Sequence, residues 1–388
     1  MMENWEVKKL GDVCELYQPK TISTKEMVDD GDYPVFGANG IIGKYDKYNH
    51  EEPQLLITCR GATCGSINIS EPKSWINGNA MVVKSKDNSL NLKFIEYLFL
   101  GGIDISKTIS GAAQPQITRQ SLSPVLISYP KSLPEQQRIV ALLDEAFAAI
   151  DKAKANAEQN LKNAKELFES YLQRVFENKG EGWEEKTFGE LFDIGSSKRI
   201  MEKDWTVEGV PFYGGKEIVK LAKFGFVMSN NYISEDKYNE FASKYDMPQL
   251  GDILITARGT IGIGYIVKKG DKFYFKDGNI ISMRAKIPTN PEFILYALKS
   301  KVIYDQFEKL TGATVSHLPI EKAKLLVLMV PNFSTQNNVV EKVQRIEAET
   351  KKLEAIYQQK IKDLEELKKS VLQKAFAGEL KTAKSLVL

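Results

Sequence analysis

An apolar or small residue recurs at every third or fourth position from Pro134 to Phe176, with no glycine and no further proline inside the segment. This spacing is typical of a helix that packs lengthwise along another helix. At about 1.5 Å per residue the helix would be roughly 65 Å long, beyond the length of most globular helices. The positions on this apolar seam are Ile139, Leu143, Phe147, Ile150, Ala153, Ala157, Leu161, Ala164, Phe168, Tyr171 and Val175.

The same pattern returns after Pro331 and continues to Gly378. Its seam consists of Val339, Val343, Ile346, Leu353, Ile356, Ile361, Leu364, Leu367, Val371 and Ala375. The two segments also end alike, with Ser170, Leu172, Gln173 and Phe176 matched by Ser370, Leu372, Gln373 and Phe376. Either the two seams bury each other within one chain, or each pairs with another chain. Equal length and equal phase favour an intramolecular coiled coil.

An internal repeat runs through the whole chain, with a spacing of about 200 residues. Landmarks that recur in the same order indicate a tandem duplication. They include Trp5-Glu6 with Trp183-Glu184, Pro34-Val35-Phe36-Gly37 with Pro211-Phe212-Tyr213-Gly214, Leu56-Ile57-Thr58-Cys59-Arg60-Gly61 with Leu254-Ile255-Thr256-Ala257-Arg258-Gly259, Gly78-Asn79 with Gly278-Asn279, Phe94-Ile95-Glu96-Tyr97 with Phe293-Ile294-Leu295-Tyr296, and Gly111-Ala112 with Gly312-Ala313.

Each repeat is predicted to be a mixed domain followed by a long helix. Short apolar runs between Gly, Asn and Pro turns predict strands at Gln54–Thr58, Met81–Lys84, Leu122–Tyr129, Asp252–Ala257, Gly264–Lys268 and Lys324–Val330. Helices are expected at Leu92–Leu100 and Glu292–Ser300.

The predicted fold class is α+β. It consists of two tandem mixed domains, separated by a long antiparallel two-helix coiled coil with a pseudo-two-fold axis. The predicted domains are residues 1–133, a first long helix over 134–179, residues 180–333, and a second long helix with a C-terminal tail over 334–388.

Composition narrows the function classes. With 43% hydrophobic and 27% charged residues the chain is expected to fold as a soluble protein, and no apolar run reaches the roughly 18 residues of a membrane span. Residues 1–10 lack the features of a signal peptide. Three cysteines suit a reducing cytoplasm, and with only two histidines they are too few for a zinc site. The net charge of +2 does not by itself indicate nucleic acid.

Catalytic motifs are not recognisable in the sequence. The stretch from Gly37 to Tyr45 has five residues between its glycines and lacks the Ser or Thr of a phosphate loop, so we interpret it as a turn-rich loop. Asn290-Pro291-Glu292-Phe293 resembles a methyltransferase signature only in part and is better read as a helix start. HExxH and G-x-S-x-G motifs are absent from the sequence. We therefore expect a non-catalytic chain.

Several residues could contact nucleic acid. Arg60 and Arg258 each stand between an apolar strand and a Gly-rich turn, where a guanidinium could reach a phosphate or a guanine edge. The alternative is an arginine that caps carbonyls or pairs with an acid, and its presence in both copies favours that structural role. Amides in loops suit adenine edges or merely shape turns. The nearest approach to a basic patch, which could equally be an ordinary solvated surface, is formed by Lys198, Arg199, Lys216, Lys220 and Lys223. The full candidate set is Lys20, Asn39, Lys44, Arg60, Asn79, Gln114, Gln116, Lys198, Arg199, Lys216, Lys220, Lys223, Arg258, Asn279 and His317.

The whole chain resembles the specificity subunit of type I restriction-modification systems. The resemblance rests on the two Trp-Glu openings, the two Leu-Ile-Thr-x-Arg-Gly turns, the loop Gly111-Ala112-Ala113-Gln114, and Pro134-Glu135-Gln136-Gln137-Arg138-Ile139. Two places depart from the pattern. Ser334-Thr335-Gln336-Asn337-Asn338-Val339 replaces the second lead-in, and His317 replaces the amide of Gln116, changes expected to alter local contacts but not the architecture.

The resemblance implies that each mixed domain reads one half of an interrupted DNA site, and that the helical pair fixes the gap between the halves and docks two modification subunits. Those subunits would be S-adenosylmethionine-dependent adenine N6-methyltransferases, joined for restriction by motor-nuclease subunits that use ATP and magnesium. No cofactor is expected in this chain. The alternatives are a coiled-coil adaptor that binds proteins or glycans, and a self-sufficient enzyme.

Overall fold

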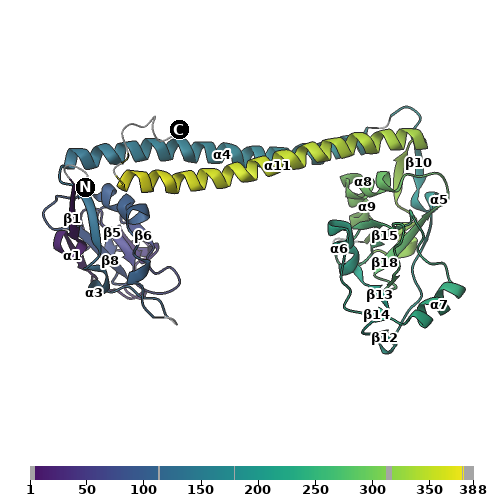
Figure 1. Ribbon diagram of the computed structural model, residues 1–388, viewed down its shortest axis with the longest axis horizontal. Helices are drawn as coiled ribbons and strands as arrows, with labels where there is room; N and C mark the ends of the chain where they lie inside the picture. Colours follow the sequence, from purple (N-terminus) through teal and green to yellow (C-terminus); the bar gives the residue numbers. More distant parts are fainter. Residues whose placement is uncertain (1–4, 112–113, 179, 312–316, 378, 380–388) are drawn as a thin grey trace. The chain divides into compact units, whose positions relative to one another are not determined.

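The computed structural model describes residues 5–111, 114–178, 180–311, 317–377 and 379, in two compact units. Unit 1 consists of Met1–Gln159 and Tyr357–Leu388, and unit 2 consists of Asn160–Ile356. Each unit therefore combines one mixed α/β domain with a part of both long helices, α4 (Leu133–Glu177) and α11 (Phe333–Phe376) (Figure 1).

The mixed domain of unit 1 is built from short strands and helices. These are β1 (Trp5–Lys9), α1 (Leu10–Val13), β2 (Cys14–Tyr17), β3 (Tyr33–Gly37), β4 (Gly40–Tyr45), β5 (Leu55–Thr58), β6 (Ile67–Ile69), β7 (Trp75–Ile76), β8 (Ala80–Ser85), α2 (Leu92–Tyr97), α3 (Arg119–Leu122) and β9 (Leu126–Pro130). The strands form a four-stranded sheet in the order β2-β8-β5-β6, a three-stranded sheet β4-β3-β7, and the antiparallel pair β1-β9.

Unit 2 repeats this plan with additional elements. It contains β10 (Glu184–Thr187), α5 (Phe188–Leu191), β11 (Phe192–Gly195), β12 (Trp205–Thr206), β13 (Val210–Tyr213), α6 (Gly215–Phe224), β14 (Tyr232–Ile233), α7 (Glu235–Lys244), β15 (Ile253–Thr256), β16 (Gly264–Ile266), β17 (Tyr274–Phe275), β18 (Ile280–Ala285), α8 (Pro291–Lys299), α9 (Lys301–Thr311), α10 (Ile320–Ala323) and β19 (Val327–Val330). Its sheets are β11-β18-β15-β16, β12-β14-β13-β17 and β10-β19.

The sheet topology confirms the tandem duplication. The order β2-β8-β5-β6 in unit 1 corresponds strand for strand to β11-β18-β15-β16 in unit 2. In both units the strand that carries the Pro34 or Pro211 landmark pairs in parallel with a short strand, β3 with β7 and β13 with β17. The Gly111-Ala112 and Gly312-Ala313 landmarks are an exception, because Ala112, Ala113, Gly312 and Ala313 lie outside the described residues.

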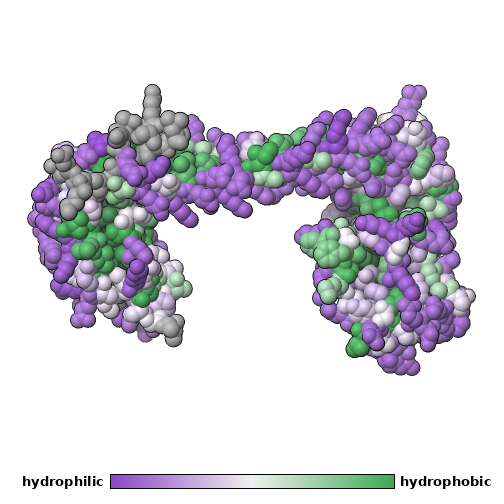
Figure 2. Space-filling model, viewed as in Figure 1, coloured by the Kyte–Doolittle hydropathy of each residue, from purple (hydrophilic) through white to green (hydrophobic). Residues whose placement is uncertain are grey.

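The two long helices run antiparallel in unit 1. Lys154 pairs with Glu365 at 2.7 Å, and Asp151 pairs with Lys368 at 2.8 Å, so residue numbers rise along one helix as they fall along the other. Because these side chains are one-third to more than one-half exposed, each pair adds at most about 1 kcal/mol. The predicted seam of α4 is confirmed, since each of its positions is buried or half-buried. Figure 2 shows charged and polar residues over most of the visible helix surface.

The predicted seam of α11 is wrong at two positions. Leu353 and Ile356 are 38% and 58% exposed, whereas Thr350 is buried. The face that continues from Val343 by steps of three and four passes through Thr350 and Tyr357 instead. Thr350 is tolerated there because its hydroxyl donates to the carbonyl of Ile346, 2.9 Å away, within the same helix.

Both long helices complete the core of a mixed domain. In unit 1 the side chains of Leu143 and Phe147 of α4, and of Val371 and Leu372 of α11, join the apolar cluster beneath α2. In unit 2 the cluster contains Leu172 and Phe176 of α4 with Val340 and Val343 of α11. In unit 1 the approach is close at Gly101, where an added Cβ would lie 2.7 Å from the Cβ of Leu372.

Most predicted elements are confirmed, with shifted ends. The strand predicted from Leu122 begins at Leu126, and the one predicted from Lys324 begins at Val327, because a turn follows the short helices α3 and α10 before each strand starts. The helix predicted at Leu92–Leu100 is α-helical only as α2 and continues as a π-helix over Leu98–Gly102. Asn290-Pro291 does begin a helix, since the side chain of Asn290 accepts from the amides of Glu292 and Phe293.

The stretch from Gly37 to Tyr45 differs from its prediction. It forms a β-hairpin between β3 and β4 and only its tip is a turn, so the prediction of a turn-rich loop is wrong for most of its length. Gly40 in this hairpin has a φ of 121°, which suits glycine. Within the described ranges, none of the helices is long and apolar enough to cross a membrane.

Candidate nucleic-acid interface

In unit 1 several loops converge where β5 ends. Arg60 follows this strand, and its main chain forms an antiparallel bridge with Gln116. The amide of Gly61 donates to the carbonyl of Pro115 at 3.1 Å, and the amide of Ile117 donates to that of Cys59 at 2.9 Å. These bonds hold the turn after β5 against the segment that contains Gln116.

Two further loops join this turn. The amide nitrogen of the Asn39 side chain donates to the hydroxyl of Thr63 at 2.7 Å, and its oxygen accepts from the hydroxyl of Thr58 at 2.9 Å. The carbonyl of Asn79 accepts from the amide of Cys59 at 3.2 Å. The structure therefore brings Asn39, Arg60, Asn79 and Gln116 together, and we call these four residues the unit 1 loop cluster.

The remaining unit 1 candidates differ in their relation to the loop cluster. Lys20 is exposed and lies between two residues that bind the Gly78 turn, since the Gln18 amide donates to the Gly78 carbonyl and the Gly78 amide donates to the Thr21 hydroxyl. Gln114 is exposed on the segment that leads to Gln116. Lys44 is exposed on β4, opposite Pro34, and no described contact joins it to the cluster.

Unit 2 assembles the same loops with the same backbone bonds. Arg258 forms a bridge with His317, which stands where unit 1 has Gln116. The amide of Leu318 donates to the carbonyl of Ala257 at 2.8 Å, and the amide of Ala257 donates to that of Asn279 at 2.8 Å. As expected, the replacement of Gln116 by His317 leaves the local architecture unchanged. We call Arg258, Asn279 and His317 the unit 2 loop cluster.

Arg60 and Arg258 have the same role in the backbone of their loops, and both side chains are exposed. Arg60 and Arg258 are exposed, and neither side chain forms an ion pair with a described residue. Their main chains do hold the loops together, which agrees with a structural contribution. The guanidinium groups are nevertheless available to an external anion.

Unit 2 has a pocket of about 550 Å³ beside its loop cluster. The predicted residues Arg199, Arg258 and Asn279 line it, together with Lys203, Lys276, Trp205 and the acids Glu202 and Asp277. Arg199 is paired with Asp277 at 2.9 Å, and the Lys276 ammonium lies 5.9 Å from the Trp205 ring. Sequence reasoning missed Lys203, Lys276 and Trp205, although Lys276 precedes the repeated Gly278-Asn279 pair and could have been noticed there.

The predicted basic patch is divided by the structure. Lys198 is exposed but does not line the pocket; its ammonium lies 5.5 Å from the Tyr245 ring, and its amide donates to the Tyr274 hydroxyl. Burial raises the pKa of the Tyr274 phenol to about 12, so this hydroxyl stays protonated. Lys216, Lys220 and Lys223 lie on α6, away from the residues of the pocket lining.

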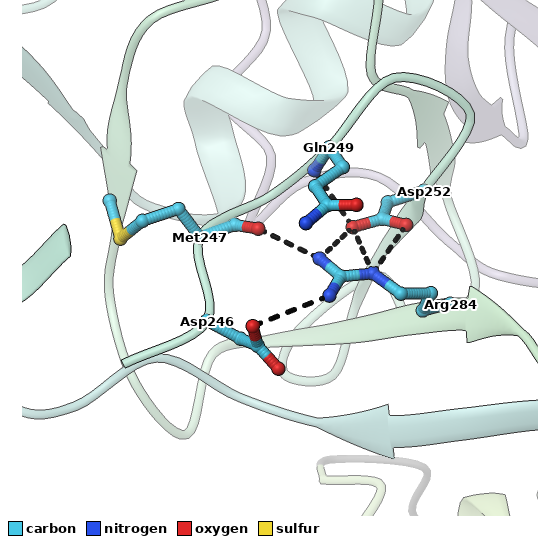
Figure 3. A network of polar contacts seen from close by, with 5 residues as sticks. All are labelled: Asp246, Met247, Gln249, Asp252 and Arg284. Atoms are coloured by element: carbon cyan, nitrogen blue, oxygen red, sulfur yellow. Dashed lines mark hydrogen bonds and ion pairs between the residues drawn. The ribbon is translucent and has the colours of Figure 1, made fainter. Parts of the chain in front are cut away.

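A polar network specific to unit 2 fixes the chain after α7 (Figure 3). Arg284 of β18 binds the buried carboxylate of Asp252 at 2.8 Å and donates to the carbonyl of Met247 at 2.8 Å. The hydrogen bonds to Asp252 raise the pKa of Arg284 further above its ordinary value, and Asp246 contributes a longer contact. Unit 1 has Lys84 and Gln54 at the corresponding places, so the network belongs to the longer loops of unit 2.

Two repeated α/β units that present exposed arginines and amides on joined loops are suited to the class of DNA-binding proteins. The family model of the type I restriction modification DNA specificity domain matches residues 2–162 and 180–363, one match in each repeat. The chain belongs to this family, and its function is DNA sequence recognition in a type I restriction-modification system, alongside methyltransferase and restriction partners.

A relative in sequence agrees with this assignment, and two solved structures share the fold. The chain is 27% identical over 334 residues to a putative type I restriction enzyme specificity subunit of Haemophilus influenzae, covering 82% of this chain and 81% of that one. An HsdS subunit from Thermoanaerobacter tengcongensis has the same fold, with a TM-score of 0.64 and 19% identity over 97% of both chains. A chain from a structural study of complex assembly in the type I R-M system gives a TM-score of 0.72 and 17% identity, over 97% of this chain and 98% of that one.

Proposed function

We propose that each unit reads one half of an interrupted DNA site through its loop cluster, and that the chain itself performs no chemistry. One observation supports this most directly: both units build the same joined loops from the same backbone bonds, with an exposed arginine at the centre. A duplicated reader suits a site with two halves, as paired DNA-binding modules suit paired half-sites.

The side chains of the clusters have the chemistry that such reading needs. Arginine donates in a fork to a phosphate or to a guanine edge, and the amides of Asn39 and Gln116 can both donate to and accept from adenine. Lys20 and the pocket residues Arg199, Lys203 and Lys276 would bind phosphates and set the register of the duplex. We propose that the chain binds DNA through Lys20 and the two loop clusters, including Asn39, Arg60, Gln116 and Arg258.

The partners would supply the reactions. We propose two modification subunits that transfer a methyl group from S-adenosylmethionine to adenine, and motor-nuclease subunits that use ATP and magnesium, all in the cytoplasm. In the described part of the chain, no group of three or more His, Cys, Asp or Glu side chains is arranged to hold a metal ion. The exposed side chains of Leu167, Leu353 and Ile356 on the long helices of unit 2 offer apolar contacts for a partner subunit.

Methylome sequencing tests the function. A host that carries this chain with its modification subunit should methylate adenine in a motif of two defined halves separated by an undefined gap, and the motif should disappear when the chain is deleted. Replacing Arg258 by Ala should weaken duplex binding by the chain with its modification partner, by about 1–3 kcal/mol if it contacts a base.

Arg345→Ala provides the matched control, because Arg345 is an exposed arginine on α11 and belongs to neither loop cluster. Its duplex affinity should equal that of the original protein. A methylome that is the same with and without the chain would contradict the proposal and would instead favour an adaptor that binds proteins or glycans.

A further inference from the structure

The largest difference in length between the two units falls at one place in the repeated fold. The chain between Gly214 and Leu254 in unit 2 is about twice as long as the corresponding chain between Gly37 and Leu56 in unit 1. Unit 1 fills this interval with the single strand β4, whereas unit 2 fills it with α6, β14 and α7. Readers of two different half-sites must differ. The loop clusters differ in two side chains, since His317 replaces Gln116 and the unit 2 cluster has no counterpart of Asn39. The longer interval is a further place where unit 2 can encode a preference of its own.

Within this interval α6 has one buried and one basic face. Ile218 and Leu221 are buried against β15 and β16. Lys216, Lys220 and Lys223 are exposed at a spacing of four and three residues, which places them on the same face. The acid of this helix, Glu217, accepts a hydrogen bond from the amide of Gly214 at 2.9 Å and is thereby held at the first turn.

Beyond α6 the chain presents large apolar side chains to solvent. The helix ends at Gly225, whose φ of 77° is the left-handed conformation that glycine favours. Phe224, Phe226 and Met228 are 58%, 73% and 84% exposed. In Figure 2 apolar side chains reach the visible surface over α6.

This exposed segment is anchored to the domain. Val227, between the two most exposed residues, packs on the apolar cluster beneath α6. The hydroxyl of Ser229 donates to the carbonyl of Asn231 at 2.6 Å and lies 3.1 Å from the carbonyl of Phe212. Phe226 and Met228 are therefore held outward by an ordered chain, a placement that costs free energy in water unless a ligand covers it.

Taking the proposed function as its basis, we propose that this surface is a second DNA contact, present in unit 2 alone. We call it the α6 surface, and it consists of Lys216, Lys220, Lys223, Phe224, Phe226 and Met228. The lysines bind phosphates, and Phe226 and Met228 make apolar contacts with bases in a groove, such as the methyl group of thymine.

The charge of α6 favours DNA over a protein partner as the occupant. The helix carries three exposed lysines and one acid, Glu217, whose carboxylate already accepts a hydrogen bond from the backbone. The exposed face of the helix is therefore positive and complements a polyanion. Apolar side chains beside such a basic face match the make-up of groove-binding proteins, which combine cations with apolar contacts.

The experiment uses the full chain in complex with its modification subunit, on duplexes that carry the motif found by methylome sequencing. Phe226→Ser with Met228→Ser should weaken binding roughly tenfold and reduce discrimination between the intact site and one whose unit 2 half is scrambled. Discrimination at the unit 1 half should not change. Replacing the three lysines by Ala should weaken binding to all sequences and lower the salt slope by about two to three.

Leu325→Ala is the matched control, because Leu325 is 55% exposed in the same unit but lies between α10 and β19. It should bind DNA as the original protein does, and all variants should keep the thermal stability of the original, since the exchanged side chains are exposed. Full affinity and full discrimination in the Phe226/Met228 variant would overturn the inference. The inference would also be overturned if this variant assembled more weakly with the modification subunit while the complex kept its DNA discrimination. That result would assign the surface to a protein partner. If the unsubstituted protein showed no preference for any DNA sequence, the proposed function itself would be refuted.

Discussion

A single buried glutamine in the first turn of each long helix ties that helix to the preceding domain. The Gln136 side chain accepts from the amide of Asn91 at 2.8 Å and donates to the carbonyls of Ser89 and Pro130, each at 2.9 Å. Gln336 repeats two of these bonds, to Asn290 and Pro331. The second lead-in, although different in sequence, therefore keeps the residue that makes the connection.

Replacing Gln136 by Leu should destabilise unit 1 by about 1–3 kcal/mol, because a buried amide and two carbonyls would lose their partners. Gln137→Leu is the control, since Gln137 is exposed one position further along the same helix. Urea unfolding of both variants measures the difference. Equal stabilities would show that solvent reaches the groups that Gln136 binds.

Tyrosines connect the domain helices to the long helices. In unit 1 the Tyr97 hydroxyl of α2 donates to Asp144 of α4, and in unit 2 the Tyr296 hydroxyl of α8 donates to Glu347 of α11 at 2.7 Å. Burial alone raises the pKa of Glu347, but hydrogen bonds from Lys351 and Tyr296 and nearby lysine charge outweigh it and hold the pKa below the ordinary value of 4.5. The ionised carboxylate is thus the form that stabilises the folded unit 2.

This contact should make the stability of unit 2 depend on pH. A carboxyl group with a lowered pKa stabilises the folded state above its unfolded pKa of about 4.5, and loses this effect as the pH falls through the folded pKa. Glu347→Gln should therefore cost about 0.5–1 kcal/mol at pH 7 and less near pH 3. Denaturant unfolding at both pH values provides the measurement, with Glu349→Gln, an exposed position on the same helix, as control. A deficit of equal size at pH 3 would argue that the charge of Glu347 is not responsible.

At the scale of the whole molecule, residues of both long helices complete the apolar core of each unit. The end of α11 supplies Val371 and Leu372 to the core of unit 1, more than 350 residues after that unit begins. The C-terminal helix is thus a structural part of the N-terminal domain. Loss of α11 beyond Ile356 would remove these side chains from the core of unit 1.

The length of the two helices gives a prediction about the DNA site. The family resemblance implies that the helix pair fixes the gap between the half-sites. If it does, seven residues inserted into α4 after Gln159 and into α11 after Ile356 add about 10 Å while keeping the apolar seams in phase. At about 3.4 Å per base pair the gap should change by about three base pairs, with the sequences of both halves unchanged. Methylome sequencing reads both quantities. An insertion into only one helix is the control and should disrupt the pairing, and an unchanged gap in the double insertion would refute the role of the helices.

Sequence reasoning reached the architecture because the relevant signals are local or periodic. The seam of α4 and the paired landmarks of the repeat follow from residue spacing alone, and the topology of the two units confirms them. The prediction failed at Leu353 and Ile356, because contact with the neighbouring helix determines which face of α11 is buried. Thr350 can lie on that buried face because its hydroxyl donates to a carbonyl within α11. Sequence reasoning also missed α6 and α7, whose short amphipathic patterns resemble those of strands and loops.

The sequence by itself determined the duplication, the long helices and the residues available for DNA contact, since these depend on residue type and spacing. Only the tertiary structure decided which of those residues meet. Arg199 lies with Arg258 and Asn279 at one pocket. Lys216, Lys220 and Lys223 lie on a separate helix face, although the sequence had suggested one basic patch of Arg199 and these lysines. The reason is physical: hydrogen bonds such as that between the amide of Ala257 and the carbonyl of Asn279 connect segments far apart along the chain, and spacing cannot encode such pairs.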